Sequence, residues 1–136
     1  MQVRKAVITA AGRGAPDHSG SDTVLKAMLP LVDRDGIVKP VIQIIAEEAL
    51  GSGIEEICVI TAPGDREFYS SHFRGMAAQL KGAGSARSQE QLKHLGEIDR
   101  RIRFTVQDRP EGYGHAVWCA REFAASEPFL LLVSDH

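Results

Sequence analysis

The residues best suited to chemistry stand near the start of the chain, where glycines and cations follow an apolar run. Residues 5–11 lead directly into Gly12-Arg13-Gly14, and Lys26 lies in the next segment. At the end of a buried strand, small residues and glycines can bring backbone N–H groups against a phosphate or a flat base. A lysine nearby adds a compact positive charge for phosphate. The pattern therefore predicts a site for a phosphorylated ligand.

The glycine motif matches neither of the two common phosphate-binding loops. A dinucleotide fingerprint needs a third glycine where this chain has Asp17, and a Walker loop needs a Gly-Lys-Ser/Thr ending that is absent. A bare Gly-x-Gly after a strand is equally consistent with a plain tight turn. On these residues alone, both interpretations stay open.

Length and composition narrow the class of protein. The 136 residues are enough to bury a core and correspond to one domain or a large part of one. A formal net charge of −2 argues against a nucleic-acid-binding surface, which normally carries a basic excess. No apolar run approaches the length of a membrane span, and the N-terminus lacks the apolar core of a signal peptide. We therefore expect a cytoplasmic protein that binds neither nucleic acid nor membrane.

The cysteines and histidines do not form a metal-binding or disulfide pattern. Cys58 and Cys119 each lie in an apolar periodic segment, which predicts two buried free thiols. The five histidines are scattered, without the spacing of zinc ligands.

The elements that must position the glycine motif follow an alternating order. Four runs rich in Val, Ile, Leu and Phe mostly lack polar alternation, which is typical of strands buried in a parallel sheet. Helical patterns separate them. The expected strands are 5–10, 56–61, 102–107 and 128–135, and the expected helices are 40–50, 65–73 and 114–125. This order predicts an α/β, doubly wound, mainly parallel sheet.

Two segments stand apart from that pattern. Residues 81–101 are polar and poor in aromatic residues, so we expect a surface excursion with a short helix at 89–95. The last apolar run ends in Ser134-Asp135-His136, at the carboxyl edge where α/β sheets bind ligands. We therefore expect the chain to be the N-terminal part of a longer protein.

Several segments together resemble the sugar-1-phosphate nucleotidyltransferases, and among them the bacterial UTP–glucose-1-phosphate uridylyltransferases (UDP-glucose pyrophosphorylases) are the most similar. The resemblance covers nearly the whole chain apart from residues 34–38 and 81–101. The segments that carry it are Ala10-Ala-Gly-Arg-Gly14, Lys26-Ala-Met-Leu-Pro-Leu-Val-Asp33, Lys39-Pro40, Gln107 and Gly112-Tyr-Gly-His-Ala-Val117.

The resemblance implies a Rossmann-like fold and formation of a nucleotide-sugar, UDP-glucose above all, with release of pyrophosphate. The implied substrates are UTP (or dTTP) and a sugar-1-phosphate, the implied cofactor is Mg²⁺, and a homo-oligomer is compatible with it. Residues 1–136 would then be the nucleotide-binding N-terminal part of the domain, with the remainder absent from this chain. The implied nucleotide-binding residues are Ala10, Ala11, Gly12, Gly14, Gln107 and Gly112; Lys26 and Arg13 would be catalytic cations, and Asp135 would bind the metal.

Each of these assignments has a simpler alternative. Gln107 can be a solvated residue at a strand end, although its amide offers the donor and the acceptor that a uracil edge requires. Asp135 can cap a following helix. His115 begins a helix and is interpreted as a packing or capping residue, and Asp33 and Lys39 can simply shape a turn.

The chain also departs from the family pattern in the glycine loop. Where the family has threonine and arginine after the second glycine, this chain has Ala15 and Pro16, and Asp17 and Asp22 add negative charge. The change removes a cation and a backbone donor from the expected phosphate site. A catalytically degenerate nucleotide-binding or regulatory relative, or a thymidylyl- or guanylyltransferase, therefore remains the alternative.

Overall fold

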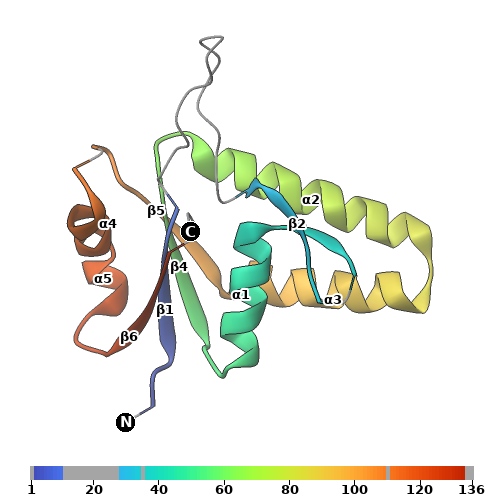
Figure 1. Cartoon of the computed structure of the whole chain (residues 1–136), viewed down its shortest axis with the longest axis horizontal. Helices are drawn as coiled ribbons and strands as arrows, with labels where there is room; N and C mark the ends of the chain where they lie inside the picture. Colours follow the sequence, from blue (N-terminus) through green and yellow to red (C-terminus); the bar gives the residue numbers. More distant parts are fainter. Residues whose placement is uncertain (1, 11–27, 35, 110, 134–136) are drawn as a thin grey trace.

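A four-stranded parallel sheet forms the centre of the protein (Figure 1). The computed structural model describes residues 2–10, 28–34, 36–109 and 111–133. The strands are β1 (Lys5–Thr9), β4 (Glu56–Thr61), β5 (Ile102–Val106) and β6 (Phe129–Val133), in the spatial order β5-β4-β1-β6. All three pairings are parallel, and Lys5 is aligned with both Glu56 and Phe129. The expected strands and the α/β, mainly parallel fold are thus confirmed.

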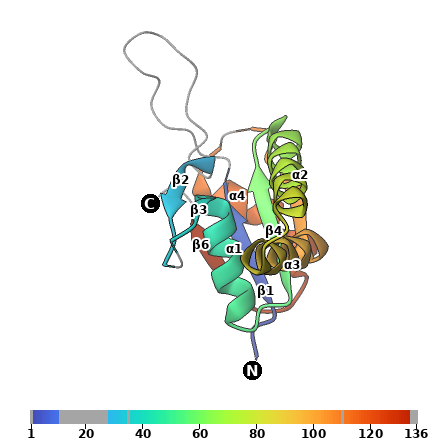
Figure 2. The same cartoon turned by 90° about the vertical axis from the view of Figure 1, so that its right-hand side faces the viewer.

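Helices cover both faces of this sheet, as Figures 1 and 2 show. On one face lie α1 (Val41–Gly51), α2 (Asp65–Ala83) and α3 (Ala86–Arg101); on the other lie α4 (Tyr113–Cys119) and α5 (Arg121–Ala124). None of the helices in the described part of the chain is long and apolar enough to cross a membrane.

The alternation of side chains along the strands divides the core into two clusters. In β1, Ala6 and Ile8 face the cluster under α1, α2 and α3, whereas Val7 faces the cluster under α4. This is the pattern that a strand buried on both faces must show, because successive side chains point to opposite sides. Both faces of β1 are buried, which fixes the strand that leads into the glycine motif.

For residues 81–101, the expected helix at 89–95 is confirmed as part of a longer helix, whereas the expected surface excursion around it was wrong. Helix α2 continues ten residues beyond the expected end at Phe73, and α3 runs over the whole of Ala86–Arg101. Leu95 and Ile98 are buried at helical spacing on a sequence that is otherwise polar. The Ser85 hydroxyl caps α3 by accepting from the Ser88 N–H at 3.0 Å. A narrow apolar stripe was therefore enough to pack α3 against α1 and α2.

Two smaller differences concern a hairpin and a helix break. Strands β2 (Pro30–Val32) and β3 (Val38–Pro40) form an antiparallel hairpin that the sequence patterns did not predict. The helix expected at 114–125 is interrupted at Ala120, between α4 and α5. In α1 the buried side chains are Ile42, Gln43, Ala46 and Ala49.

Candidate functional site

The candidate site lies where the strands of the parallel sheet end. Ala10, just after β1, donates its N–H to the Ile60 carbonyl at 2.8 Å. Gln107, just after β5, donates its N–H to the Thr61 carbonyl at 2.7 Å. The last two residues of β4 therefore hold Ala10 on one side and Gln107 on the other. The structure brings these two expected nucleotide-binding residues to the same edge of the sheet.

The connectivity of the sheet also favours this edge. From β1 the chain passes outward to β4 and β5, and then crosses to β6 on the other side of β1. Ligands of open α/β sheets bind at the carboxyl ends of the strands, where the order reverses in this way. Here the reversal lies between β1 and β6, which end together because Thr9 pairs with Val133.

The side chain of Gln107 is held in place by two hydrogen bonds. It is 6% exposed, and its amide nitrogen Nε2 lies 3.2 Å from the Gly112 carbonyl oxygen and 3.0 Å from Nδ1 of His115. Both of these hydrogen bonds run through Nε2, and the amide oxygen Oε1 is not among the buried side-chain atoms of the described residues that lack a partner. The side chain is thus a buried, anchored group and not a solvated strand end.

Gly112 has a conformational reason to be glycine. Its φ of 96° lies in the region that L side chains rarely adopt, although a Cβ there would meet nothing within 4 Å. This backbone turn aims the carbonyl of Gly112 at two donors, the Gln107 amide and the Ala116 N–H at 3.1 Å. Gly112 therefore begins α4 and positions Gln107 at the same time.

His115 contributes to the site in a way that the sequence interpretation missed. Besides Gln107, its ring contacts Glu111 (Nε2 to Oε2, 3.7 Å), the Cys119 sulfur (4.0 Å) and the stacked ring of Trp118, with centroids 5.8 Å apart. It is neither a simple packing residue nor a helix cap. The eight-residue spacing between Gln107 and His115 is a signal that could have suggested the contact.

Thr61 is a second residue at this edge that was not anticipated. It ends β4 between Ala10 and Gln107 and is fully buried. Its hydroxyl has no hydrogen-bond partner among the described residues. No sequence signal distinguishes it from an ordinary strand threonine.

Most of the expected phosphate and metal groups fall outside the described residues. These are Ala11, Gly12, Arg13, Gly14, Lys26 and Asp135, together with Ala15 and Pro16 of the altered loop. Within the described ranges, no group of three or more His, Cys, Asp or Glu side chains could hold a metal ion.

The prediction of a buried free thiol is confirmed for Cys58 but not for Cys119. Both thiols are free, and Cys58 is buried, whereas Cys119 is partly exposed. Burial raises the pKa of the Cys58 thiol, which a hydrogen bond from the thiol to Thr105 at 3.4 Å and the charge of Arg103 partly oppose.

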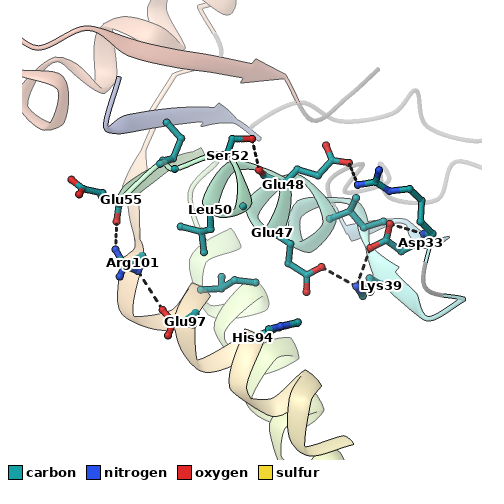
Figure 3. A pocket seen from close by; sticks show the side chains of 16 residues that line it. Asp33, Lys39, Glu47, Glu48, Leu50, Ser52, Glu55, His94, Glu97 and Arg101 are labelled. Atoms are coloured by element: carbon teal, nitrogen blue, oxygen red, sulfur yellow. Dashed lines mark hydrogen bonds and ion pairs between the residues drawn. The ribbon is translucent and has the colours of Figure 1, made fainter. Parts of the chain in front are cut away.

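A hollow bordered by described residues lies away from the sheet edge. It has a volume of about 910 Å³ and is enclosed by the β2–β3 hairpin, α1 and α3 (Figure 3). Lys39 is 2% exposed there and bridges Asp33 and Glu47, with Nζ–O distances of 2.9 and 2.8 Å. Lys39 and Asp33 thus do more than shape a turn, because they anchor the hairpin to α1.

This arrangement of strands, helices and edge residues agrees with what comparison with known proteins shows. The chain belongs to the nucleotidyl transferase family, whose family model matches residues 5–136. It is 38% identical to UTP–glucose-1-phosphate uridylyltransferase from Bacillus subtilis, over 98% of this chain and 44% of that protein. It is 40% identical to the Streptococcus pneumoniae protein of the same name, over 98% of this chain and 43% of that one.

Solved structures give the same family likeness. A UDP-glucose pyrophosphorylase complexed with UDP-glucose matches with a TM-score of 0.70 and 27% identity, over 98% of this chain and 46% of that one. An apo UDP-glucose pyrophosphorylase matches with a TM-score of 0.73 and 27% identity, over 98% of this chain and 48% of that one. The chain thus spans less than half the length of these relatives.

Proposed function

We propose that this chain is the nucleotide-binding N-terminal part of a nucleotidyltransferase that makes UDP-glucose from UTP and glucose-1-phosphate. The observation that carries the proposal is the anchored amide of Gln107, buried at the carboxyl edge beside Ala10 with its oxygen lacking a described partner. An amide oxygen to which no described residue donates is available to accept a hydrogen bond from a ligand. The proposed reaction, uridylyl transfer to glucose-1-phosphate, is taken from the names of the similar proteins.

The proposed reaction is a transfer at phosphorus. A phosphate oxygen of the sugar-1-phosphate attacks the α-phosphorus of UTP, the bond to the β-phosphate breaks, and pyrophosphate leaves. Such a reaction requires positive charge on the leaving phosphates and an aligned nucleophile. In this proposal Lys26 and Arg13 supply the charge, and the backbone at Ala11, Gly12 and Gly14 approaches the nucleotide.

A divalent metal fits the chemistry of the residues that follow β6. Asp135 comes two residues after Val133, which is paired with the last residue of β1. A carboxylate is the hard ligand that Mg²⁺ prefers, and Mg²⁺ commonly takes one or two carboxylates and completes its shell with phosphates and water. When bound, the ion would neutralise charge on the phosphates. We propose Asp135 as its protein ligand.

The test is pyrophosphate release by the full-length protein, with each nucleoside triphosphate and glucose-1-phosphate. We expect UTP or dTTP to be preferred, and Gln107→Ala to lose most of that preference, because a base-reading amide contributes about 1–3 kcal/mol of discrimination. Gln89→Ala is the matched control, since Gln89 is exposed on α3. Equal use of all four nucleotides by the unmutated protein would contradict the proposal.

The altered loop provides a second candidate, a relative that binds nucleotide without turnover. Pro16 stands where the family pattern has an arginine, and losing one charged donor to a transition state costs about 10²–10³ in rate. Tight UTP binding by the full-length protein, with no release of pyrophosphate from any sugar-1-phosphate, would favour this second function.

A further inference from the structure

We propose that His115 is a positioning residue for base selection. It holds the Gln107 amide so that only the carbonyl oxygen is left for the base, and the site thereby selects bases that present an N–H at that point. The inference rests on the proposed function, because it assumes that Gln107 contacts the base. It goes beyond that function by naming what fixes the amide and which bases it rejects.

The orientation of the amide follows from its partners. The Gly112 carbonyl oxygen can only accept a hydrogen bond, so the Gln107 atom 3.2 Å away must be the nitrogen. The same nitrogen lies 3.0 Å from Nδ1 of His115. An amide nitrogen carries two hydrogens and accepts nothing, so Nδ1 must be the acceptor of the second one.

This in turn fixes the state of the imidazole. With Nδ1 as an acceptor, the ring is neutral and carries its hydrogen on Nε2. The groups near Nε2 are acceptors, the Glu111 carboxylate at 3.7 Å and the Cys119 sulfur at 4.0 Å. The Trp118 ring stacks on the imidazole at an interplanar angle of 21°. The surroundings of His115 are therefore consistent with the tautomer that the amide requires.

The consequence concerns the Watson–Crick edge of the base. Both amide hydrogens are used inside the protein, which leaves Oε1 as the atom of the amide that can contact the base. Uracil and thymine carry an N3–H that can donate to it, whereas N3 of cytosine and N1 of adenine are acceptors and would repel it. The sequence predicted that the Gln107 amide offers a donor and an acceptor together; in this geometry only the acceptor is available.

Turning the amide over would be unfavourable as long as His115 is present. The flipped amide would aim Oε1 at the Gly112 carbonyl oxygen, which cannot donate. Nδ1 could donate to Oε1 only if the imidazole moved its hydrogen from Nε2, which would leave an unprotonated nitrogen facing the Glu111 carboxylate 3.7 Å away. Without the imidazole, only the Gly112 carbonyl would oppose the flip. A flipped amide would present N–H groups to the base and so accept cytosine.

The decisive experiment measures UTP and CTP binding by calorimetry, in the full-length protein and two variants. We expect His115→Leu to reduce the preference for UTP over CTP by about tenfold or more, with tighter CTP binding in absolute terms. His115→Asn is the conservative control, because its side-chain oxygen can take the place of Nδ1 as acceptor and should preserve the preference. Tighter CTP binding is a result that mere loosening of α4 would not produce.

A second measurement needs no substitution. Long-range ¹H–¹⁵N NMR spectra of the unmutated protein at neutral pH should show His115 with Nε2 protonated and Nδ1 unprotonated. The opposite tautomer would overturn the inference, even if His115→Leu fails to fold. An unchanged UTP preference in a folded His115→Leu variant would overturn it too, while leaving the proposed function standing. Absence of any nucleotide binding by the unmutated protein would contradict both.

Discussion

At the scale of single residues, one backbone carbonyl serves two purposes at the candidate site. The Gly112 oxygen accepts from the Ala116 N–H within α4 and from the Gln107 side chain. The start of the helix and the orientation of the amide therefore depend on the same peptide unit. Position 112 requires a glycine because its φ is 96°. Any other residue with this backbone conformation would be strained by about 1–3 kcal/mol.

The two cysteines should differ in reactivity, because their surroundings differ. Cys58 is 1% exposed and burial raises the pKa of its thiol, so little reactive thiolate is present near neutral pH. Cys119 is partly exposed on α4. We expect iodoacetamide to label Cys119 in the folded protein and Cys58 only after unfolding, as mass spectrometry would reveal. A Cys119→Ser variant labelled rapidly at Cys58 in its folded state would contradict this expectation.

At the scale of elements, α3 provides a test of how a polar helix is held. Ile98 is 2% exposed and belongs to the core cluster under α1 and α2. Truncating a buried isoleucine costs about 2–5 kcal/mol through lost burial and the cavity that remains. Ile98→Ala should therefore lower the free energy of unfolding by about that amount in urea titrations.

Lys93→Ala on the same helix is the matched control, since Lys93 is exposed. It should change the free energy of unfolding by less than about 0.5 kcal/mol. Equal effects of Ile98→Ala and Lys93→Ala would mean that α3 does not pack as described.

The strands were predictable from sequence because burial on both faces leaves an unbroken apolar run. Glu56–Thr61 was predicted with its observed bounds, and the other three strands were predicted to within two residues at each end. Of helix α3 only residues 89–95 were predicted, because its many charged residues obscured the two buried positions, Leu95 and Ile98. The β2–β3 hairpin was missed because its stability depends on a tertiary contact, the burial of Lys39 against Glu47 of α1.

The candidate site was predictable only in part, because some of its contacts are tertiary and leave no local pattern in the sequence. Ala10 and Gln107 could be placed at the carboxyl edge, because each follows an apolar run that had to be a strand. The hydrogen bond between the Gln107 amide nitrogen and His115 joins the end of a strand to a helix. Local sequence patterns do not reveal such a tertiary contact. The buried hydroxyl of Thr61 is likewise visible only in three dimensions.

At the scale of the whole molecule, the two ends of the parallel sheet differ in the residues they carry. The carboxyl end carries the candidate site, where backbone and side-chain groups converge. The amino end is held together by charge. There Arg4 contacts Glu55 at 2.9 Å and Glu127 at 2.8 Å, and Lys5 contacts Glu127 at 2.7 Å. These contacts join the segments that lead into β1, β4 and β6.

This charged cluster predicts how the stability of the molecule depends on pH. The Lys5 and Arg4 side chains hydrogen-bond the Glu127 carboxylate and hold its pKa below the ordinary value for glutamate. A carboxyl whose pKa is lower in the folded than in the unfolded state stabilises the fold above the unfolded pKa. That contribution disappears as the pH falls through the folded pKa. Arg4 stays charged throughout, because its hydrogen bonds to Glu55 and Glu127 raise its pKa.

We therefore compare the protein with a Glu127→Gln variant, in which the carboxylate is absent. Urea unfolding at neutral pH should show the variant to be less stable, because Arg4 and Lys5 lose their charged partner. The difference should shrink as the pH is lowered below about 4.3, the ordinary glutamate value, since protonation then removes the same charge from the unmutated protein. Taking the difference between the two proteins cancels the other carboxyl groups that titrate in this range. A gap that stays constant down to pH 3 would show that the charge of Glu127 does not hold the amino end of the sheet.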